Sequence, residues 1–194
     1  MAEKEAKAQE EGLDENGLVI HSYESTVLVV MPVRDFAETT LRYARSALFN
    51  VHVHSHSVSA DDSGLIQGTL QDEFQVDKAL DASISMEDYS GVIFCGGPGA
   101  LEMADHPEVQ RLAKEAAEAG KLIASWGDST AVLAKSGVAR GKRVTGNPAL
   151  AEMLKSAGAK YVRTQVQVDG SMVTAVDDSA GFRFAKSLVQ VVGI

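Results

Sequence analysis

The stretch Lys121–Ala134, KLIASWGDSTAVLA, constrains the fold more than any other part of the chain. Its apolar start is typical of a buried strand, and its apolar end is typical of a helix. Between them, Asp128, Ser129 and Thr130 are residue types that cap helix starts, because their side-chain oxygens accept free backbone N–H groups. The pattern predicts a strand that runs into a helix through a sharp turn around Gly127, which is the shape of a nucleophile elbow.

Such a turn holds one residue in a backbone conformation that costs about 1–3 kcal/mol for a residue with a side chain and almost nothing for glycine. The chain therefore keeps the turn but places Gly127 where a nucleophile would stand. Ser129 and Thr130 have no base beside them in the sequence, and helix capping explains both.

The length of 194 residues and the 45% hydrophobic content predict one domain with a sizeable core. Residues 1–24 differ in composition, since they hold seven acidic residues against two lysines. We expect residues 1–24 to be a solvated acidic tail and residues 25–194 to form the domain. A role of the tail in docking against a second subunit remains an alternative.

The charge and the apolar pattern exclude several classes of partner. The net charge is −9 and no Lys/Arg cluster interrupts it, so we expect no nucleic-acid binding. No apolar run approaches the ~20 residues of a membrane span, and no secretory signal is visible, so we expect no membrane association. A lone cysteine, Cys95, rules out an internal disulfide and indicates a cytoplasmic protein.

Strands and helices alternate along the rest of the chain. This order predicts an α/β fold with a doubly wound, flavodoxin-like parallel sheet sandwiched by helices and a small antiparallel hairpin. Asp169-Gly170 is the hairpin turn. The predicted strands, besides the one before the turn, are residues 25–32, 51–57, 88–95, 141–146, 161–168 and 172–176, with a further hairpin at 64–76. The predicted helices are 35–48, 106–119, 148–157 and 180–192, the last with Phe182, Phe184, Ala185, Leu188, Val191 and Val192 inward.

Ligands bind at the carboxyl ends of the strands in such sheets. Residues 31–38, 96–100 and the turn at Gly127 meet there. The backbone amides of Gly96 and Gly97 could form an oxyanion hole or an anion-binding nest. The alternative is a plain strand-to-helix turn, because the GGPGA sequence has no phosphate-binding spacing.

Three histidines, His52, His54 and His56, alternate along a predicted strand and so share one face. Imidazoles at this spacing can converge on a metal ion. A polar sheet face or a subunit contact is the alternative, and no acidic residue or cysteine lies beside them in the sequence. We therefore predict no metal and no cofactor.

These segments together resemble the ThiJ/PfpI family of the class I glutamine-amidotransferase-like superfamily. The resemblance covers residues 25–194, and it implies homodimers or higher homo-oligomers. The enzymes of this family are similar to cysteine-dependent hydrolases, hydratases and glyoxalase- or deglycase-type catalysts, so the resemblance implies an activity of this kind. These enzymes place a cysteine at the turn, often a histidine after it, and a carboxylate after the first strand. The segments that carry the resemblance are STVLVVMP, Glu38, DYSGVIFCGGPGA, KLIASWGDSTAVLA, GVARGKRVTG and the terminal hairpin and helix.

The chain departs from this pattern at the turn. An ungapped alignment places Gly127 at the cysteine position and Asp128 at the histidine position, and a shift of one residue would place Trp126 at the cysteine position. Neither register supplies a nucleophile. Glu38 matches the carboxylate, and Asn147 stands where some members have a histidine.

Cys95 falls at the end of a predicted strand. We interpret it as a small buried hydrophobic residue rather than a relocated nucleophile, because nothing near it in the sequence would lower the pKa of its thiol.

Two functions remain open. The chain is either a pseudoenzyme-like paralogue that binds a small molecule or plays a regulatory or structural role, or a hydrolase, hydratase or lyase with Glu38 and Asp128 as general acid and base. Close approach of Glu38 and Asp128 would favour the second function, whereas Asp128 capping its own helix would favour the first. The candidate ligand-binding residues are Gly96, Gly97, Trp126, Gly127, Ser129 and Asn147.

Overall fold

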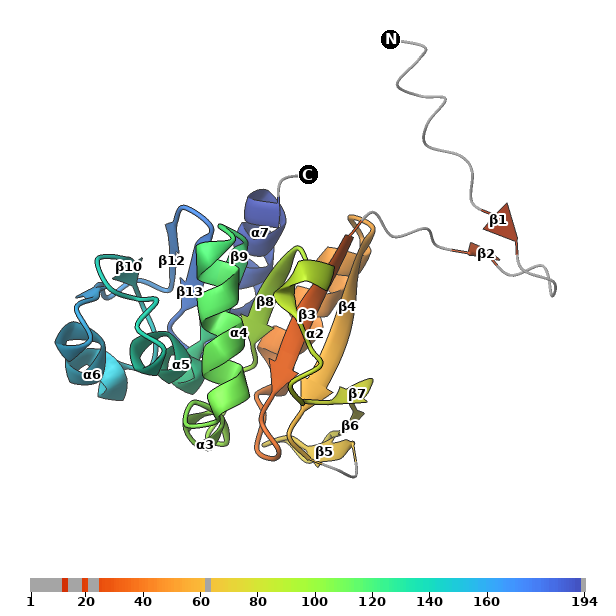
Figure 1. The fold of residues 1–194 in the computed structure, drawn as a ribbon, viewed down its shortest axis with the longest axis horizontal. Coiled ribbons are helices and arrows are strands. Elements are labelled where there is room, and N and C mark those ends of the chain that lie inside the picture. The colour runs from red at the N-terminus through yellow and green to blue at the C-terminus, as the bar shows by residue number, and fades with distance from the viewer. Residues whose placement is uncertain (1–11, 14–18, 21–24, 62–63, 193–194) are drawn as a thin grey trace, which may run out of the picture.

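The computed structural model describes residues 12–13, 19–20, 25–61 and 64–192. They form an α/β fold around a mainly parallel seven-stranded sheet, which confirms the predicted class (Figure 1). The strand order is β12-β13-β9-β8-β3-β4-β7, and only β12 runs antiparallel to its neighbour. The strands are β3 (Ser25–Met31), β4 (Val53–Ser59), β7 (Lys78–Ala79), β8 (Gly91–Phe94), β9 (Leu122–Trp126), β12 (Val166–Asp169) and β13 (Met172–Ala175).

Helices cover both faces of the sheet because its central strands are apolar on both sides. In β3, Leu28 and Val30 pack on one face with α4 (Pro107–Glu118), whereas Val27 and Val29 pack on the other with α2 (Glu38–Phe49). Figure 1 shows α4 in front of the sheet and α2 behind it. The other helices are α3 (Ala100–Met103), α5 (Thr130–Lys135), α6 (Ala151–Ser156) and α7 (Gly181–Val192), and α7 lies on the same face as α2.

The first predicted helix begins three residues later than expected. Asp35 has a φ of 51°, outside the helical region, and Phe36 makes a bridge to Gly68. Phe36 therefore belongs to a loop, although its side chain is buried in the core, and α2 starts at Glu38. The apolar spacing that predicted a helix from residue 35 reflects burial of this loop.

Both predicted hairpins are confirmed. β5 (Leu65–Gln67) pairs with β6 (Glu73–Gln75), and β12 pairs with β13 around Gly170, whose φ is 62°. The strand predicted at 161–168 is divided in two. Its first part belongs to β11 (Lys160–Tyr161), which pairs in parallel with β10 (Arg143–Val144) outside the main sheet.

The predicted inward face of the last helix was wrong at Phe182. This side chain is 68% exposed and packs edge-on against Tyr43, with ring centroids 6.2 Å apart. Phe184 is fully buried. Residues two apart on a helix point in different directions, so Phe182 and Phe184 cannot both face the core.

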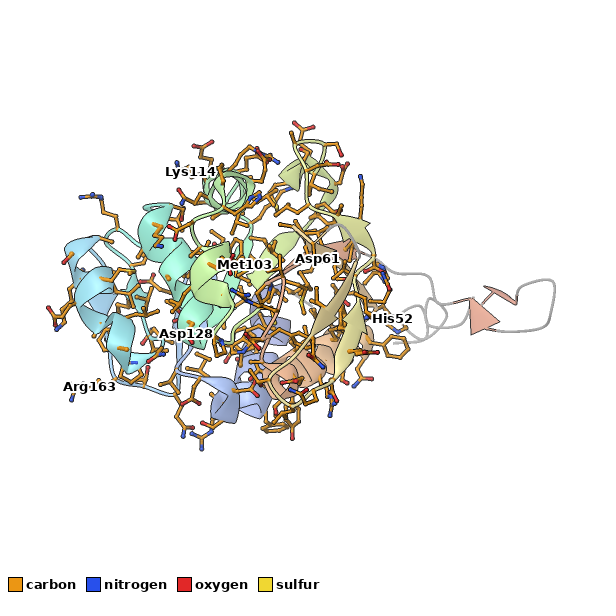
Figure 2. The ribbon with its side chains drawn as sticks, turned by 90° about the horizontal axis from the view of Figure 1, so that it is seen from below. His52, Asp61, Met103, Lys114, Asp128 and Arg163 are labelled. Atoms are coloured by element: carbon orange, nitrogen blue, oxygen red, sulfur yellow. The ribbon has the colours of Figure 1, made fainter. Side chains whose placement is uncertain are left out.

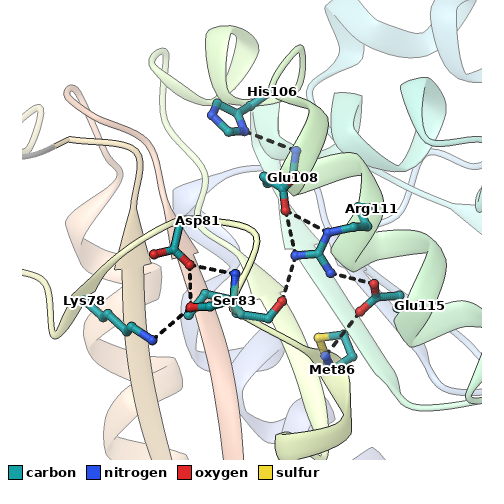
Figure 3. Close-up of polar contacts among 9 residues, drawn as sticks. Lys78, Asp81, Ser83, Met86, His106, Glu108, Arg111 and Glu115 are labelled. Carbon is teal, nitrogen blue, oxygen red and sulfur yellow. Dashed lines mark hydrogen bonds and ion pairs between the residues drawn. The ribbon is translucent and has the colours of Figure 1, made fainter.

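Arg111 attaches the segment between β7 and β8 to α4 (Figure 3). Its guanidinium donates to Glu108 at 2.7 Å and to Glu115 at 2.5 Å within the helix. It also donates to the Ile84 carbonyl at 2.7 Å, and Glu115 in turn accepts the backbone N–H of Met86 at 3.3 Å. The side chain therefore fixes the segment that leads into β8.

The predicted acidic tail lies outside the described residues, apart from β1 (Gly12–Leu13) and β2 (Val19–Ile20), which pair antiparallel. Among the described residues, no helix combines the length and the apolarity needed to cross a bilayer.

Candidate functional site

The predicted sharp turn connects β9 to α5 through one 3-10 turn, Gly127–Ser129. Gly127 has a φ of 59°, in the left-handed region that favours glycine. Trp126 has φ −142° and ψ 150°, which is ordinary extended backbone. Gly127 is therefore the pivot of the turn, and Trp126 is the last residue of the strand.

Space lies open beside the pivot. Among the described residues other than its two chain neighbours, only Asp177 would contact a Cβ added to Gly127, through its Cα at 3.8 Å. Ser129 holds the turn from inside: its hydroxyl lies 2.7 Å from the Phe94 carbonyl and accepts the Trp126 N–H at 3.1 Å. Ser129 is fully buried and is not one of the residues that line the open space, so it supports the turn from within.

The open space belongs to a cavity of about 330 Å³ at the carboxyl end of the sheet, which we call the turn cavity. It brings together five predicted site residues, namely Gly97, Trp126, Gly127, Asp128 and Asn147. Glu38, Gly96 and Ser129 are not part of its lining. The remaining lining residues are Ala37, Thr69, Pro98, Pro148, Asp177 and Asp178.

Asp128 is held by Asn147 rather than by its own helix. The Asn147 Nδ2 donates to Asp128 Oδ1 at 2.5 Å, and the Asn147 backbone N–H donates to the Gly127 carbonyl at 3.2 Å. Asn147 therefore binds both the pivot and the residue after it. Figure 2 shows Asp128 well away from His52, which lies at the edge of the molecule.

Glu38 faces the β5–β6 hairpin. Its side chain accepts the Thr69 hydroxyl at 2.8 Å and the Leu70 N–H at 2.6 Å, and the residue is 1% exposed. A Cβ on Gly68 would lie 2.1 Å from Glu38 Oε1, so this close approach requires glycine. Glu38 lines a second cavity, of about 390 Å³, and does not share the turn cavity with Asp128.

Two carboxylates of the turn cavity, Asp177 and Asp178, are not among the predicted site residues. Asp178 accepts the N–H groups of Thr40 at 2.7 Å and Thr39 at 3.2 Å, so it caps the start of α2 from the far end of the chain. Asp177 accepts the N–H of Ser179 at 2.9 Å. The sequence contains a signal for these residues, because Asp-Asp-Ser stands between a predicted strand and a predicted helix and is typical of a helix cap.

Close packing explains the glycines of the loop after β8. A Cβ on Gly96 would lie 2.6 Å from the indole of Trp126, and one on Gly97, whose φ is 112°, would lie 2.3 Å from the Asp35 carbonyl. The Gly96 carbonyl also accepts the Ala37 N–H at 2.8 Å. An anion-binding role of these amides remains a prediction, and only Gly97 reaches the turn cavity.

Cys95 has no exposed surface. Burial raises the pKa of its thiol well above the usual value, because the core disfavours the thiolate, and the negative charge of Asp178 adds to the effect. The thiol is therefore kept neutral and out of reach of solvent.

The histidine face differs from the predicted one. His52 precedes β4 with a φ of 57°, and His56 lies on β4 with its Nδ1 2.6 Å from the Tyr89 hydroxyl. Within the described part of the chain, no three His, Cys, Asp or Glu side chains are grouped in a way that could hold a metal ion.

Comparison with known proteins gives the family. Residues 25–191 match the DJ-1/PfpI family. The chain belongs to this family. A DJ-1/PfpI fold is also what solved structures show: a ThiJ/PfpI domain protein from Brachyspira murdochii superposes with a TM-score of 0.81 at 23% identity, over 86% of this chain and 95% of the other.

Two relatives show how similar the chain is to other sequences. An uncharacterized protein of Methanocaldococcus jannaschii is 31% identical over 152 residues, which are 77% of this chain and 73% of the relative. A deglycase of Pyrococcus horikoshii is 25% identical over 122 residues, which are 63% of this chain and 73% of the relative.

Proposed function

We propose that this chain is a DJ-1/PfpI protein without the nucleophilic cysteine, and that it binds a small polar molecule in the turn cavity. The observation that carries the proposal is Gly127 at the pivot, with a φ of 59° and open space where a side chain would stand. The fold keeps a shaped cavity at the carboxyl end of the sheet, where such folds bind ligands.

Thiol chemistry needs an accessible thiolate. The one cysteine is fully buried, with a raised thiol pKa, and so cannot supply it. A deglycase of Pyrococcus horikoshii and a glutathione-independent glyoxalase of Caenorhabditis elegans are among the relatives. The names of these relatives support our proposal that the turn cavity binds a small molecule. We propose no thiol step in this chain because Cys95 is buried.

We further propose a cytoplasmic homodimer. The exposed aromatic pair Tyr43 and Phe182 supports a contact with a second copy, because large exposed apolar side chains that cluster mark interaction surfaces. The single free thiol fits a reducing compartment.

One observation favours the alternative of carboxylate chemistry. Thr69 lines the turn cavity and donates its hydroxyl to Glu38, so it connects the buried carboxylate with the cavity that Asp128 lines. A hydrolase, hydratase or lyase could use this connection for proton transfer.

Two measurements on the purified protein test the proposal. Native mass spectrometry of protein from its own host should show a retained small molecule, and adding that molecule back to stripped protein should change the fluorescence of Trp126, the single tryptophan, which lines the cavity. Methylglyoxal consumption should stay at background. Turnover that survives Cys95→Ala and is lost in Asp128→Asn would favour the alternative, and turnover lost in Cys95→Ala would overturn the proposal.

A further inference from the structure

We propose that the acidic tail, residues 1–24, docks on a basic patch of its own domain, which is formed around β10 and β11. The tail carries seven acidic residues against two lysines, so its charge is −5. The patch carries five positive side chains, all of them exposed, which match this charge: Arg140, Lys142, Arg143, Lys160 and Arg163.

The fold assembles the patch from two segments that are separate in the sequence. Arg143 of β10 is paired with Lys160 of β11, so their side chains leave this small sheet on the same face. The Lys160 N–H donates to the Lys142 carbonyl at 2.8 Å. The Arg140 side chain lies beside the turn before β11, 3.3 Å from the position of a Cβ added to Gly158. The parallel pairing of β10 with β11 therefore makes one positive surface.

The positive charges of the patch have no counter-charge in the described part of the chain. None of its five side chains forms an ion pair there, whereas Lys155, on the neighbouring α6, is paired with Glu152. The Asp169 carboxylate is bonded to the backbone N–H of Arg143, at 2.7 Å. Like charges at facing positions of neighbouring strands repel each other. The pairing of Arg143 with Lys160 is therefore unfavourable by itself, and an anionic partner relieves it.

The tail joins the domain at the edge of the sheet where the patch lies. Through the registers of β12, β13, β9 and β8, Asp169 stands level with Leu28 of β3, close to the start of that strand at Ser25. β12, which contacts β10, is four strands from β3, or about 19 Å at ~4.8 Å per strand. An extended chain covers about 3.3 Å per residue, so roughly ten residues of the tail span this distance and reach β10.

A tethered segment has an advantage over a free acidic partner. The tail accounts for −5 of the net charge of −9, so residues 25–194 carry −4 and repel a polyanion that approaches from solution. A segment on a short flexible tether acts at an effective concentration in the millimolar range. Surface ion pairs, which are individually weak, are therefore sufficient to hold the tail on the patch.

A spin label on the tail tests the docking in the full chain. Ala8→Cys supplies a thiol in the tail, and labelling is confined to it because Cys95 is buried. At low ionic strength, the label should broaden the backbone amide NMR signals of residues 140–143 and 160–163 more than those of the rest of the domain. Added salt should remove the broadening, because salt screens exposed charges.

A mixed sample distinguishes the tail of the same chain from that of a second copy. It combines spin-labelled protein without isotope enrichment and nitrogen-15 protein without the spin label. The signals of residues 140–143 and 160–163 should stay sharp in this sample, because each tail docks on its own domain.

A charge reversal inside the patch is compared with one outside it. Arg143→Glu should lower the ratio of docked to free tail about fivefold, as expected for the loss of a surface ion pair. It should keep the fold, because an acidic side chain at this position faces Lys160 and removes the like-charge pair. Lys114→Glu makes the same change in net charge at an exposed position of α4, and Figure 2 shows Lys114 well away from Arg163. It should leave the broadening unchanged.

Three results would overturn the inference. Absence of broadening at low ionic strength, or broadening spread evenly over the domain, would show that the tail has no fixed docking place. Broadening in the mixed sample as strong as in the labelled chain would assign the patch to the tail of a second copy. An equal loss of broadening in Lys114→Glu and Arg143→Glu would show an effect of net charge alone.

Discussion

At the scale of single residues, Gly127 determines what chemistry the turn can support. Gly127→Ala should fold and lose about 1–3 kcal/mol of unfolding free energy, because the cost is backbone strain rather than collision. Urea denaturation followed by circular dichroism measures it. Gly137→Ala is the matched control, since Gly137 has a φ of 81° and no described residue beyond its chain neighbours lies within 4 Å of an added Cβ. A much larger loss at Gly127 than at Gly137 would show that the space beside the pivot is filled.

Cys95 should make stability fall at high pH. Below about pH 9.0 the thiol is protonated in the folded and the unfolded chain, and its contribution is complete. As the pH rises further, the unfolded chain releases the proton while the folded chain retains it, so the unfolding free energy decreases by up to about 1.4 kcal/mol per pH unit. Denaturation series at pH 8–10 should show a weaker decrease in Cys95→Ala. Equal slopes in both proteins would mean that the thiol ionises normally in the fold.

At the scale of elements, Glu38 connects α2 to the β5–β6 hairpin, and two variants separate this structural role from an acid–base role. Glu38→Ala removes both acceptors and should cost about 1–3 kcal/mol, with faster hydrogen exchange in residues 64–76. Glu38→Gln should be mild, because the amide oxygen still accepts from Leu70 and the Thr69 hydroxyl can turn to accept from the amide. Turnover abolished by both variants alike would instead indicate that the carboxylate acts as acid or base.

The elements themselves were largely predictable, and the contacts between them were not. The alternation of apolar strands and helical faces gave the parallel sheet and both hairpins, because strand and helix periods are properties of local sequence. Phe36 was assigned to a helix because burial from a loop leaves the same apolar signal. The capping of α2 by Asp178 joins residues 138 positions apart along the chain and has no local signal.

In the candidate site, too, the positions of residues along the chain were predictable, whereas the contacts of their side chains were not. Gly127, Asp128 and Asn147, which line one cavity in the structure, could be named from the sequence because a strand–turn–helix pattern and a family resemblance marked their positions. The expected approach of Glu38 to Asp128 depends on the direction in which each side chain turns, and the structure turns Glu38 toward Thr69. Rotamer choice depends on neighbours in space, which the sequence does not list.

At the scale of the whole molecule, we expect a homodimer of twice the 20.6 kDa chain mass. The support is the exposed pair on α2 and α7, where Phe182 is 68% and Tyr43 46% exposed. Size-exclusion chromatography with light scattering should show Phe182→Asp shifted toward the monomer. Leu101→Asp, at a 43% exposed position on α3, is the control and should stay dimeric. A wild-type monomer at micromolar concentration would contradict the expectation.

The cap that Asp178 places on α2 also has a consequence for synthesis of the chain. The first N–H groups of α2 meet their acceptor only after residue 178 has left the ribosome, and α7, which covers α2 on the same face, follows later still. Until then the nascent chain carries a helix with an open start and an uncovered apolar face. Folding of this domain is therefore completed only after α7 has been synthesised, and until then the nascent chain exposes an apolar surface of the kind that favours aggregation.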